Sequence, residues 1–308
     1  MSANHICTEP TVPDPTDGQL PTSASSMDLI HLNESFMTPA IGRLQRLGHQ
    51  LQRNMASQTT VPAAPWRDAF LSQIEQLKQP AFTLSSLHNI STASAPQLVP
   101  RARTVIYRGT WASLTPNPKN PAPLNPPAYE TDLPTITTDA RMHKVTELFP
   151  TAEQSSVGGP VEAVFWIPDS MTQWRIRGRV CMIGPDIDAP QGISTRDFLT
   201  PYMRRRGDVS SWSWSRELTA QFGNLSPFMR GTFRNPPPGT PISQSPGGGL
   251  GLGQTVEDLE DGVARENFRV LVIVPEEVDR VDLTDPERGR RWDYRLEGRE
   301  WKERELWP

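Results

Sequence analysis

The chain has 308 residues, of which 36% are hydrophobic and 32 are prolines. This length is enough for one large domain or two small ones, and the many prolines indicate that part of it is loop or tail. A formal net charge of -4 excludes a general attraction to nucleic acid or to anionic membranes. No segment approaches the roughly 18 consecutive apolar residues of a membrane span, so we expect neither nucleic acid nor membrane as a partner.

The two cysteines, Cys7 and Cys181, lie in a predicted tail and a predicted strand, so no structural disulfide is expected. Sparse cysteine of this kind is typical of a reducing compartment, and we predict a cytoplasmic protein. The two cysteines and the five histidines show no metal-ligand spacing, so no metal site is predicted.

Residues 1–60 are rich in Pro, Ser, Thr and Gln, which predicts a disordered tail. Two alternatives stay open. Residues 37–60 carry several arginines and no acid, a bias shared with mitochondrial targeting segments. Translation from Met55 would instead make everything upstream an extension or an alternative start. We assign 61–308 to a single domain.

The first predicted element of that domain is a helix over 66–79, since Trp66, Phe70 and Ile74 recur at helical spacing. The β-like run over 98–111 predicts a strand that ends at Gly109. A mobile Pro/Asn-rich loop is expected near 112–130. Thr138 or Asp139 is expected to cap a further helix.

Residues 161–167 and 173–182 form a predicted hairpin, because Pro168-Asp169-Ser170 between them has the composition of a turn. The second strand alternates: Trp174 and Ile176 take one face, and Arg175 and Arg177 take the other. Such alternation is typical of an antiparallel strand with one face on the core.

The end of the chain holds a predicted mobile loop near 234–262, an apolar strand over 268–274 and a hairpin of 292–296 with 301–307. Strands therefore outnumber strong helices. The sequence predicts a mainly β (α+β) fold, a small barrel with peripheral helices.

Three short segments place basic or amide side chains at a strand end or a helix start. They are residues 103–109 (RTVIYRG), 137–144 (TTDARMHK) and 173–178 (QWRIRG). Exposed backbone amides at a helix start and nearby cations bind phosphate well. Three or four such contacts would hold a phosphate group even in an acidic protein.

In order and spacing these segments resemble the FMN-binding motifs of the pyridoxamine 5'-phosphate oxidase-like family, and most closely a branch found in cyanobacteria and fungi. The resemblance runs from about Pro65 to Pro308 and includes the run SPFMRGTFRNPPPG at 226–239. It implies an FMN-binding split β-barrel of about six antiparallel strands with peripheral helices. It also implies a homodimer with the flavin at the subunit interface.

The resemblance further implies roles for particular residues. Arg103 and Lys144 would bind the FMN phosphate, helped by Thr137 and Thr138, and Gln173 would reach the isoalloxazine ring. Arg108 stands where the oxidases have a lysine that touches flavin and substrate, and His143 stands where they have an arginine. The full set of implied cofactor contacts is Arg103, Val105, Ile106, Arg108, Thr137, Thr138, Arg141, His143, Lys144, Gln173 and Arg291.

For the substrate, Tyr202, Arg206 and Ser210 repeat the spacing with which the oxidases hold a phosphate group. The arginine-histidine pair that the oxidases carry near their C-terminus has no counterpart around 279–291. The glycine run at 247–253 fits neither a dinucleotide fingerprint nor a P-loop and is interpreted as a flexible linker.

The resulting hypothesis is an FMN-dependent oxidoreductase that acts on a small molecule, with no side chain as the chemical catalyst. Two alternatives are a non-catalytic flavin-binding or sensing protein and a split barrel without cofactor that serves as a dimeric scaffold. Turnover of bound flavin by a reduced substrate separates the first from the others.

Overall fold

The computed structural model describes residues 60–90, 97–150 and 157–308, which belong to one compact unit. The predicted tail lies outside these residues except for Thr60, so the tail, its alternatives and the domain boundary stay predictions. No helix among the described residues is long and apolar enough to cross a membrane.

Most of the strands form one sheet, in the order β10-β9-β8-β6-β5-β1-β2, with β4 paired to β8. Every pairing in it is antiparallel. Its strands are β1 (Ala81–Asn89), β2 (Leu98–Ile106), β4 (Thr135–Asp139), β5 (Val157–Ile167), β6 (Thr172–Ile183), β8 (Phe268–Asp282), β9 (Arg290–Glu297) and β10 (Glu300–Leu306). A second sheet pairs β3 (Tyr129–Glu130) with β7 (Arg204–Arg205). The predicted mainly β fold is confirmed, but the expectation of about six strands is wrong, because the main sheet of the described residues has eight and does not close.

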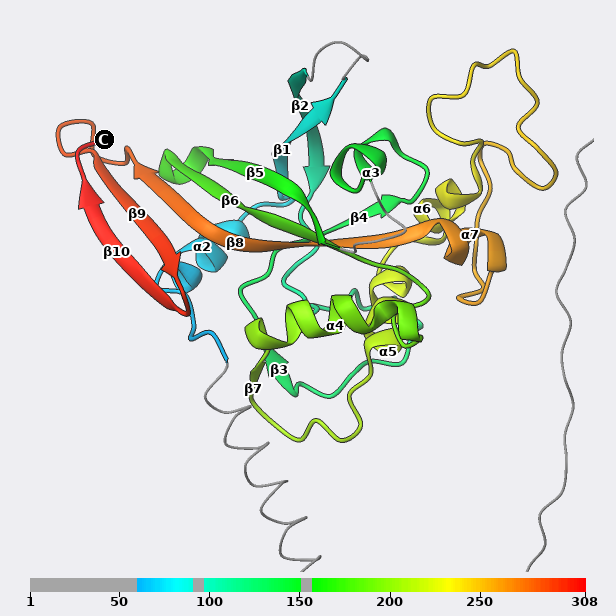
Figure 1. Ribbon diagram of the computed structural model, residues 1–308, viewed down its shortest axis with the longest axis horizontal. Helices are drawn as coiled ribbons and strands as arrows, with labels where there is room; N and C mark the ends of the chain where they lie inside the picture. The colour runs from blue at the N-terminus through cyan, green and yellow to red at the C-terminus, as the bar shows by residue number, and fades with distance from the viewer. Residues whose placement is uncertain (1–59, 91–96, 151–156) are drawn as a thin grey trace, which may run out of the picture. The chain divides into compact units, whose positions relative to one another are not determined.

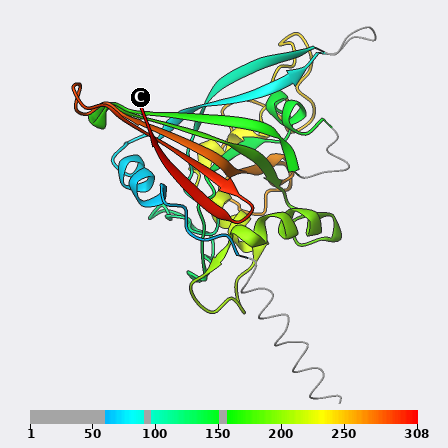
Figure 2. The same ribbon diagram turned by 60° about the vertical axis from the view of Figure 1, so that its left-hand side comes forward.

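Short helices surround the sheet. They are α2 (Arg67–Ile74), α3 (His143–Leu148), α4 (Ile193–Leu199), α5 (Trp214–Gly223), α6 (Pro227–Gly231) and α7 (Gly262–Asn267). Single 3-10 turns lie at Pro168–Ser170, Pro190–Gly192, Thr200–Tyr202 and Thr232–Arg234. Figure 1 shows α3 on one side of the sheet and α4 with α5 on the other, and Figure 2 shows how the strands twist across one another.

Strand β8 separates two hydrophobic cores. Leu271 and Ile273 pack into a cluster with α2 and α3, whereas Val270, Val272 and Val274 pack into a cluster with α5 and α7. Successive side chains of a strand point to opposite faces, so a run that is apolar at every position is buried on both. Burial on both faces explains the continuous apolar run that the sequence predicts as a strand over 268–274. In the structure the strand continues to Asp282.

The β5–β6 hairpin and its alternation are confirmed. Trp174 and Ile176 are fully buried, while Arg177 and Arg179 are exposed. The C-terminal hairpin is also confirmed, with Gly298 at a φ of +66° in its turn.

The predicted cap of the second helix is wrong. Thr138 and Asp139 pair with Arg269 and Phe268 of β8, so their backbone belongs to the sheet. The helix α3 begins at His143 instead, and its N-cap makes no side-chain hydrogen bond.

Strand β1 was not predicted, although it pairs with β2 over its whole length. Its inward positions are Phe82, Leu84 and the buried Ser86. A buried serine interrupts the apolar alternation that marks a half-buried strand, so the pattern gave no signal.

Candidate functional site

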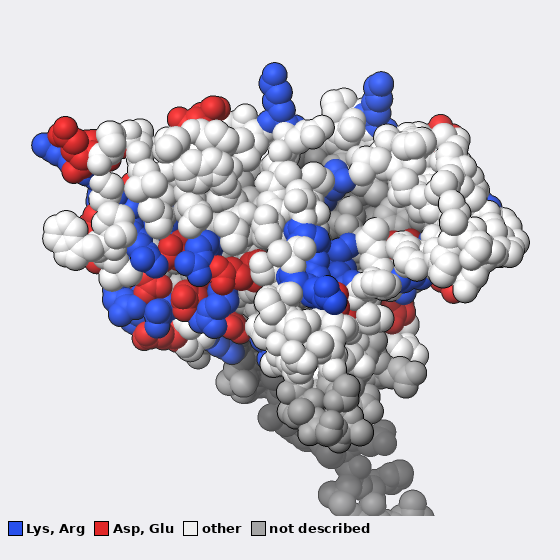
Figure 3. All heavy atoms as spheres, turned by 90° about the horizontal axis from the view of Figure 1, so that it is seen from above, with Lys and Arg blue, Asp and Glu red and all other residues white. Residues whose placement is uncertain are grey.

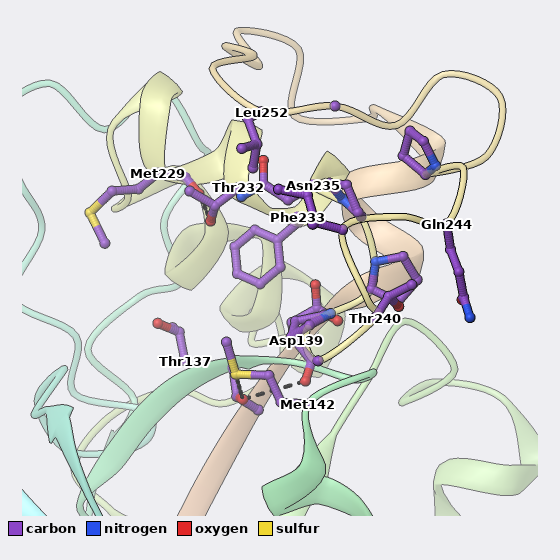
Figure 4. A pocket seen from close by; sticks show the side chains of 18 of the residues that line it. Thr137, Asp139, Met142, Met229, Thr232, Phe233, Asn235, Thr240, Gln244 and Leu252 are labelled. Carbon is purple, nitrogen blue, oxygen red and sulfur yellow. Dashed lines mark hydrogen bonds between the residues drawn. The ribbon is translucent and has the colours of Figure 1, made fainter.

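A cavity of about 740 Å³ opens between β4, α6 and the loop that follows α6. This volume lies within the roughly 300 to 1,000 Å³ of small-molecule sites. Figure 4 shows side chains from these elements around it, with Phe233 on one wall and Thr137 and Met142 on the opposite wall. The loop from Asn235 to Leu252 supplies the outer wall, so part of the predicted loop near 234–262 lines a binding cavity.

Arg108 lines this cavity directly after β2. Its backbone amide donates to the carbonyl of Thr135 at 2.9 Å, which joins the chain after β2 to β4. Its Nε is buried and has no hydrogen-bond partner among the described residues, and burial lowers the pKa of its guanidinium. A desolvated cation with an unused donor favours an acceptor of a ligand.

Lys144 lies at the edge of the same cavity. Its Nζ donates to Thr138 Oγ1 at 3.0 Å and contacts Met142 Sδ at 2.7 Å, and both partner residues line the cavity. Burial first, and then the positive charge of Arg103, lower the pKa of Lys144. Two neighbouring cations of this kind stabilise a bound anion.

Arg103 is half-buried on β2 and pairs with Glu147 of α3. It also donates to Ser86 Oγ at 2.6 Å and to the Leu84 carbonyl at 3.3 Å. The Glu147 side chain is only 8% exposed, so it partly neutralises the predicted phosphate site. Sequence reasoning missed Glu147 and Ser86, because neither belongs to a motif.

Arg141 and His143 have other contacts. Arg141 donates to Asp139 through Nε at 2.9 Å and through its terminal nitrogen at 2.6 Å, so its charge is paired. The imidazole of His143 lies close to Gly239, where a Cβ would stand 2.8 Å from Nε2. A phosphate contact of Arg141 would therefore have to compete with Asp139.

Val105 and Ile106 lie at the end of β2, the outermost strand on that side of the sheet. Alternate backbone groups of an edge strand face away from its neighbour and are free to meet a ligand. This position is compatible with the predicted backbone contacts to a flavin edge.

Gln173 and Arg291 lie far from this cavity. Both pair with Val281 of β8, whereas Thr137 pairs with Val270 at the other end of that strand. Val270 and Val281 are eleven positions apart on β8, which corresponds to roughly 36 Å along the strand. One chain therefore does not bring these two residues to the cavity, because β4 and β9 lie at opposite ends of β8 (Figure 1).

The strand face that carries Gln173 and Arg291 is charged. Arg291 pairs with Asp279 at 2.8 Å and Arg177 with Glu277 at 2.7 Å, and neighbouring pairs continue across β9 and β10. Figure 3 shows cationic and anionic side chains intermingled on one side of the molecule.

The predicted substrate residues do not line the cavity either. Arg206 pairs with Glu130, to which its Nε donates at 3.0 Å, and Ser210 Oγ donates to Asp208 Oδ2 at 2.7 Å. Tyr202 is half-buried, and burial raises the pKa of its hydroxyl. Arg206 and Ser210 are thus engaged by carboxylates in the single chain, and the predicted substrate contact stays a prediction.

Sequence reasoning assigned no site role to the loop side of the cavity, although the family resemblance included residues 226–239. Met229, Phe233 and Leu252 line it together with five prolines of the loop, Pro236, Pro237, Pro238, Pro241 and Pro246. The signal was present in the fixed backbone of the proline run, which a composition-based interpretation treats as linker.

Comparison with known proteins identifies the region that contains β1–β6. Residues 63–184 match the family model described as pyridoxamine 5'-phosphate oxidase, FMN-binding domain. This segment is an FMN-binding domain of that family. The predicted family and the predicted cofactor are thereby confirmed.

The match spans the predicted cofactor residues from Arg103 to Gln173, whereas Arg291 and the three predicted substrate residues fall outside it. The contacts of individual side chains with FMN stay predictions.

Two relatives are similar to most of the chain. A crystal structure of a pyridoxamine 5'-phosphate oxidase-related, FMN binding protein from Nostoc punctiforme matches 80% of this chain and 100% of its own, with a TM-score of 0.53 and 22% sequence identity. Uncharacterized protein YGR017W of Saccharomyces cerevisiae is 21% identical over 312 residues, which cover 80% of this chain and 98% of that protein. At these identities the Nostoc structure shows the shared fold.

Proposed function

We propose that this protein is an FMN-dependent oxidoreductase that acts on a small molecule. The observation that carries the proposal is the cavity beside β4. Arg108, which belongs to the segment that matches the FMN-binding family model, lines this cavity, and its buried Nε has no partner among the described residues. When bound, FMN would supply the hydride or electron transfer. The protein's own residues would hold the cofactor, exclude water and orient the substrate.

The donor set fits the phosphate end of FMN. Lys144 has no carboxylate within ion-pair distance among the described residues, and it stands near Arg103 and next to the hydroxyl of Thr138. A phosphate dianion would replace unfavourable contact between the two cations with charge-assisted hydrogen bonds. Thr137 lines the cavity from the same strand and adds backbone or hydroxyl contacts.

Arg108 would hold the flavin end. Its guanidinium lines the cavity, its Nε lacks a partner, and Val105 and Ile106 precede it on the edge strand. The apolar side chains of Phe233, Met229 and Leu252 complete the wall, and they would exclude water from the ring.

We further propose a homodimer in which each flavin contacts both subunits. The separation of Gln173 and Arg291 from Thr137 along β8 means that one FMN molecule does not reach both groups in one chain. A second copy, packed on the face of alternating charge, would bring its Gln173 and Arg291 to the ring of the first.

For the substrate we propose a small molecule that stacks on the exposed face of the flavin. A substrate phosphate held by Tyr202, Arg206 and Ser210 would have to compete with Glu130 for Arg206. This pairing supports a substrate other than a pyridoxine phosphate.

The first experiment is an absorbance scan of the purified protein, followed by melting curves with added FMN. A ligand that binds the folded state raises its stability by mass action, so a saturable FMN-dependent shift is expected. Bleaching of the flavin by a reduced substrate and recovery with oxygen would support the oxidoreductase. Binding without bleaching would support a flavin-binding or sensing protein, and a colourless protein without a melting shift would contradict both.

The shared site is tested by complementation. One variant carries Arg103→Ala and Lys144→Ala, the other Gln173→Ala and Arg291→Ala, and each alone should bind FMN weakly. If subunits exchange freely, half of the dimers in an equimolar mixture are mixed and have one complete site, so about a quarter of all sites should bind FMN tightly. No recovery in a mixture shown to exchange would contradict the shared site.

A further inference from the structure

A second, smaller cavity lies between the 112–129 segment and α5, away from the proposed flavin site. Its volume is about 260 Å³. It shares no lining residue with the larger cavity. Since a water molecule occupies roughly 30 Å³ in the liquid, the space corresponds to about eight or nine waters, enough for a small organic molecule.

Glu217 is the only ionisable carboxylic acid among the residues that line this cavity, and it is 3% exposed. Its Oε2 accepts a hydrogen bond from Asn125 Nδ2 at 2.9 Å. Its Oε1 is buried and has no hydrogen-bond partner among the described residues. A buried carboxyl oxygen without a partner is unfavourable, so either a proton or an external donor must satisfy it.

The surroundings of Glu217 act on its negative charge in opposite directions. The residue lies in the first turn of α5, where the helix dipole stabilises an anion. Burial nevertheless raises the pKa of Glu217, and Asn125 opposes that rise only in part. The side chain of Asn125 is fully engaged, because it also donates to the Ser213 carbonyl and accepts from the Ser213 amide.

The other walls are suited to an apolar body. Leu114, Leu124, Pro126 and Pro127 line the cavity, together with the ring of Tyr129. An aromatic ring attracts a cation to its face, and the apolar side chains favour hydrocarbon.

We propose that this cavity binds a small organic cation, a protonated amine with a short apolar body, whose ammonium group pairs with Glu217. The ammonium would pair with the Glu217 carboxylate, whose Oε1 lacks a partner among the described residues. The hydrocarbon part would lie against the leucine and proline side chains. A neutral ligand of the same shape would bury its apolar part but would leave the carboxylate unpaired.

One rival explanation involves only water. Gln221, one helical turn after Glu217, also has a buried Nε2 without a partner among the described residues. A single buried water between the two side chains would satisfy both atoms without any ligand. The amine and water explanations differ in whether added amine binds.

The experiment uses the full chain saturated with FMN, with benzylamine as the probe and benzyl alcohol as its uncharged analogue. Binding is measured by calorimetry and by melting shift near neutral pH. Benzylamine should bind saturably, and Glu217→Gln should weaken it between about tenfold and about a hundredfold, as expected for one charge-assisted contact. Benzyl alcohol should bind wild type and Glu217→Gln equally.

Two control variants complete the design. Glu257→Gln removes an exposed carboxylate outside both cavities and should leave benzylamine affinity unchanged. Leu124→Trp enlarges a half-exposed side chain on the cavity wall and should weaken benzylamine without altering Glu217. Absence of saturable benzylamine binding, or equal affinity in wild type and Glu217→Gln, would overturn the proposal and leave the buried water as the explanation.

Discussion

Replacement of Lys144 by methionine should have opposite effects on FMN binding and on the stability of the protein without FMN. Lys144 Nζ has only uncharged partners among the described residues, Thr138 Oγ1 and Met142 Sδ. Its pKa is lowered by burial and by Arg103, so its charge is a cost to the folded chain. Asp139 and Glu147 oppose that cost only in part, and a bound anion would offset more of it.

The magnitudes follow from these contacts. Loss of one charge-assisted hydrogen bond to phosphate should weaken FMN binding by about 1.5 to 3 kcal/mol, or about tenfold to 150-fold in Kd. Methionine keeps an unbranched apolar stem of similar length, so the free energy of unfolding without FMN should stay the same or rise. No ion pair is broken, in contrast to a change at Arg103.

The assay is calorimetric titration with FMN, combined with urea unfolding of the cofactor-free protein. Lys119→Met is the matched control, because Lys119 is exposed and lines neither cavity. It removes the same charge and should change the Kd by less than about twofold, since water and salt screen the interactions of an exposed charge. Equal weakening by both variants, or a Lys144→Met protein with unchanged Kd, would refute a phosphate site at Lys144.

Three further outcomes are expected. FMN affinity should rise as the pH increases through about 6, where phosphate gains its second charge. It should fall again at high pH, when Lys144 loses its proton, and this fall should come at a lower pH than for an ordinary lysine because the pKa of Lys144 is lowered. In FMN titrations across this pH range, Lys144→Arg should abolish the fall at high pH and keep the rise near pH 6. Gly239→Ala should lower unfolding stability by about 1 to 2 kcal/mol, because Gly239 has a φ of +88° on the cavity wall; an unchanged melting curve would contradict this. Burial raises the pKa of Glu217, so the folded chain keeps that proton to higher pH than the unfolded chain, and stability should decline as pH rises through the folded pKa. Glu217→Gln should remove the decline in denaturant unfolding, and an identical slope in both proteins would argue against a buried acid.

The elements with simple periodicity were predictable from the sequence. The alternation of Trp174 and Ile176 with Arg175 and Arg177 reports directly on burial, and the structure confirms it. Strand β1 and the start of α3 were not predictable, because contacts with neighbouring strands determine both. Ser86 is buried among groups from β2 and α3, and Thr138 and Asp139 are fixed by pairing with β8. Such tertiary contacts override local propensity.

The candidate site divides in the same way. The motifs predicted the cations Arg103, Arg108 and Lys144, because their residue types are those that phosphate chemistry needs. They did not predict the ion pair between Glu147 and Arg103, because Glu147 lies outside the motifs and the sequence does not indicate which residue it contacts. Its presence implies that FMN must compete with Glu147 for Arg103, so Arg103 should contribute less to affinity than an unpaired arginine would.

The length of β8 links the fold to the proposed assembly. A motif spacing fixes which residues approach a ligand but not which copy of the chain provides them. In this sheet β4 and β9 pair with the same edge of β8 at opposite ends, so Thr137 and Arg291 are held apart by the strand itself. Any bending that brought them together would break the pairing of β8 with β6, which runs almost the full length of both strands. If all the predicted contacts are made to one flavin, a second subunit is therefore a geometric requirement, and a monomeric protein with full FMN affinity would exclude Gln173 and Arg291 from the site.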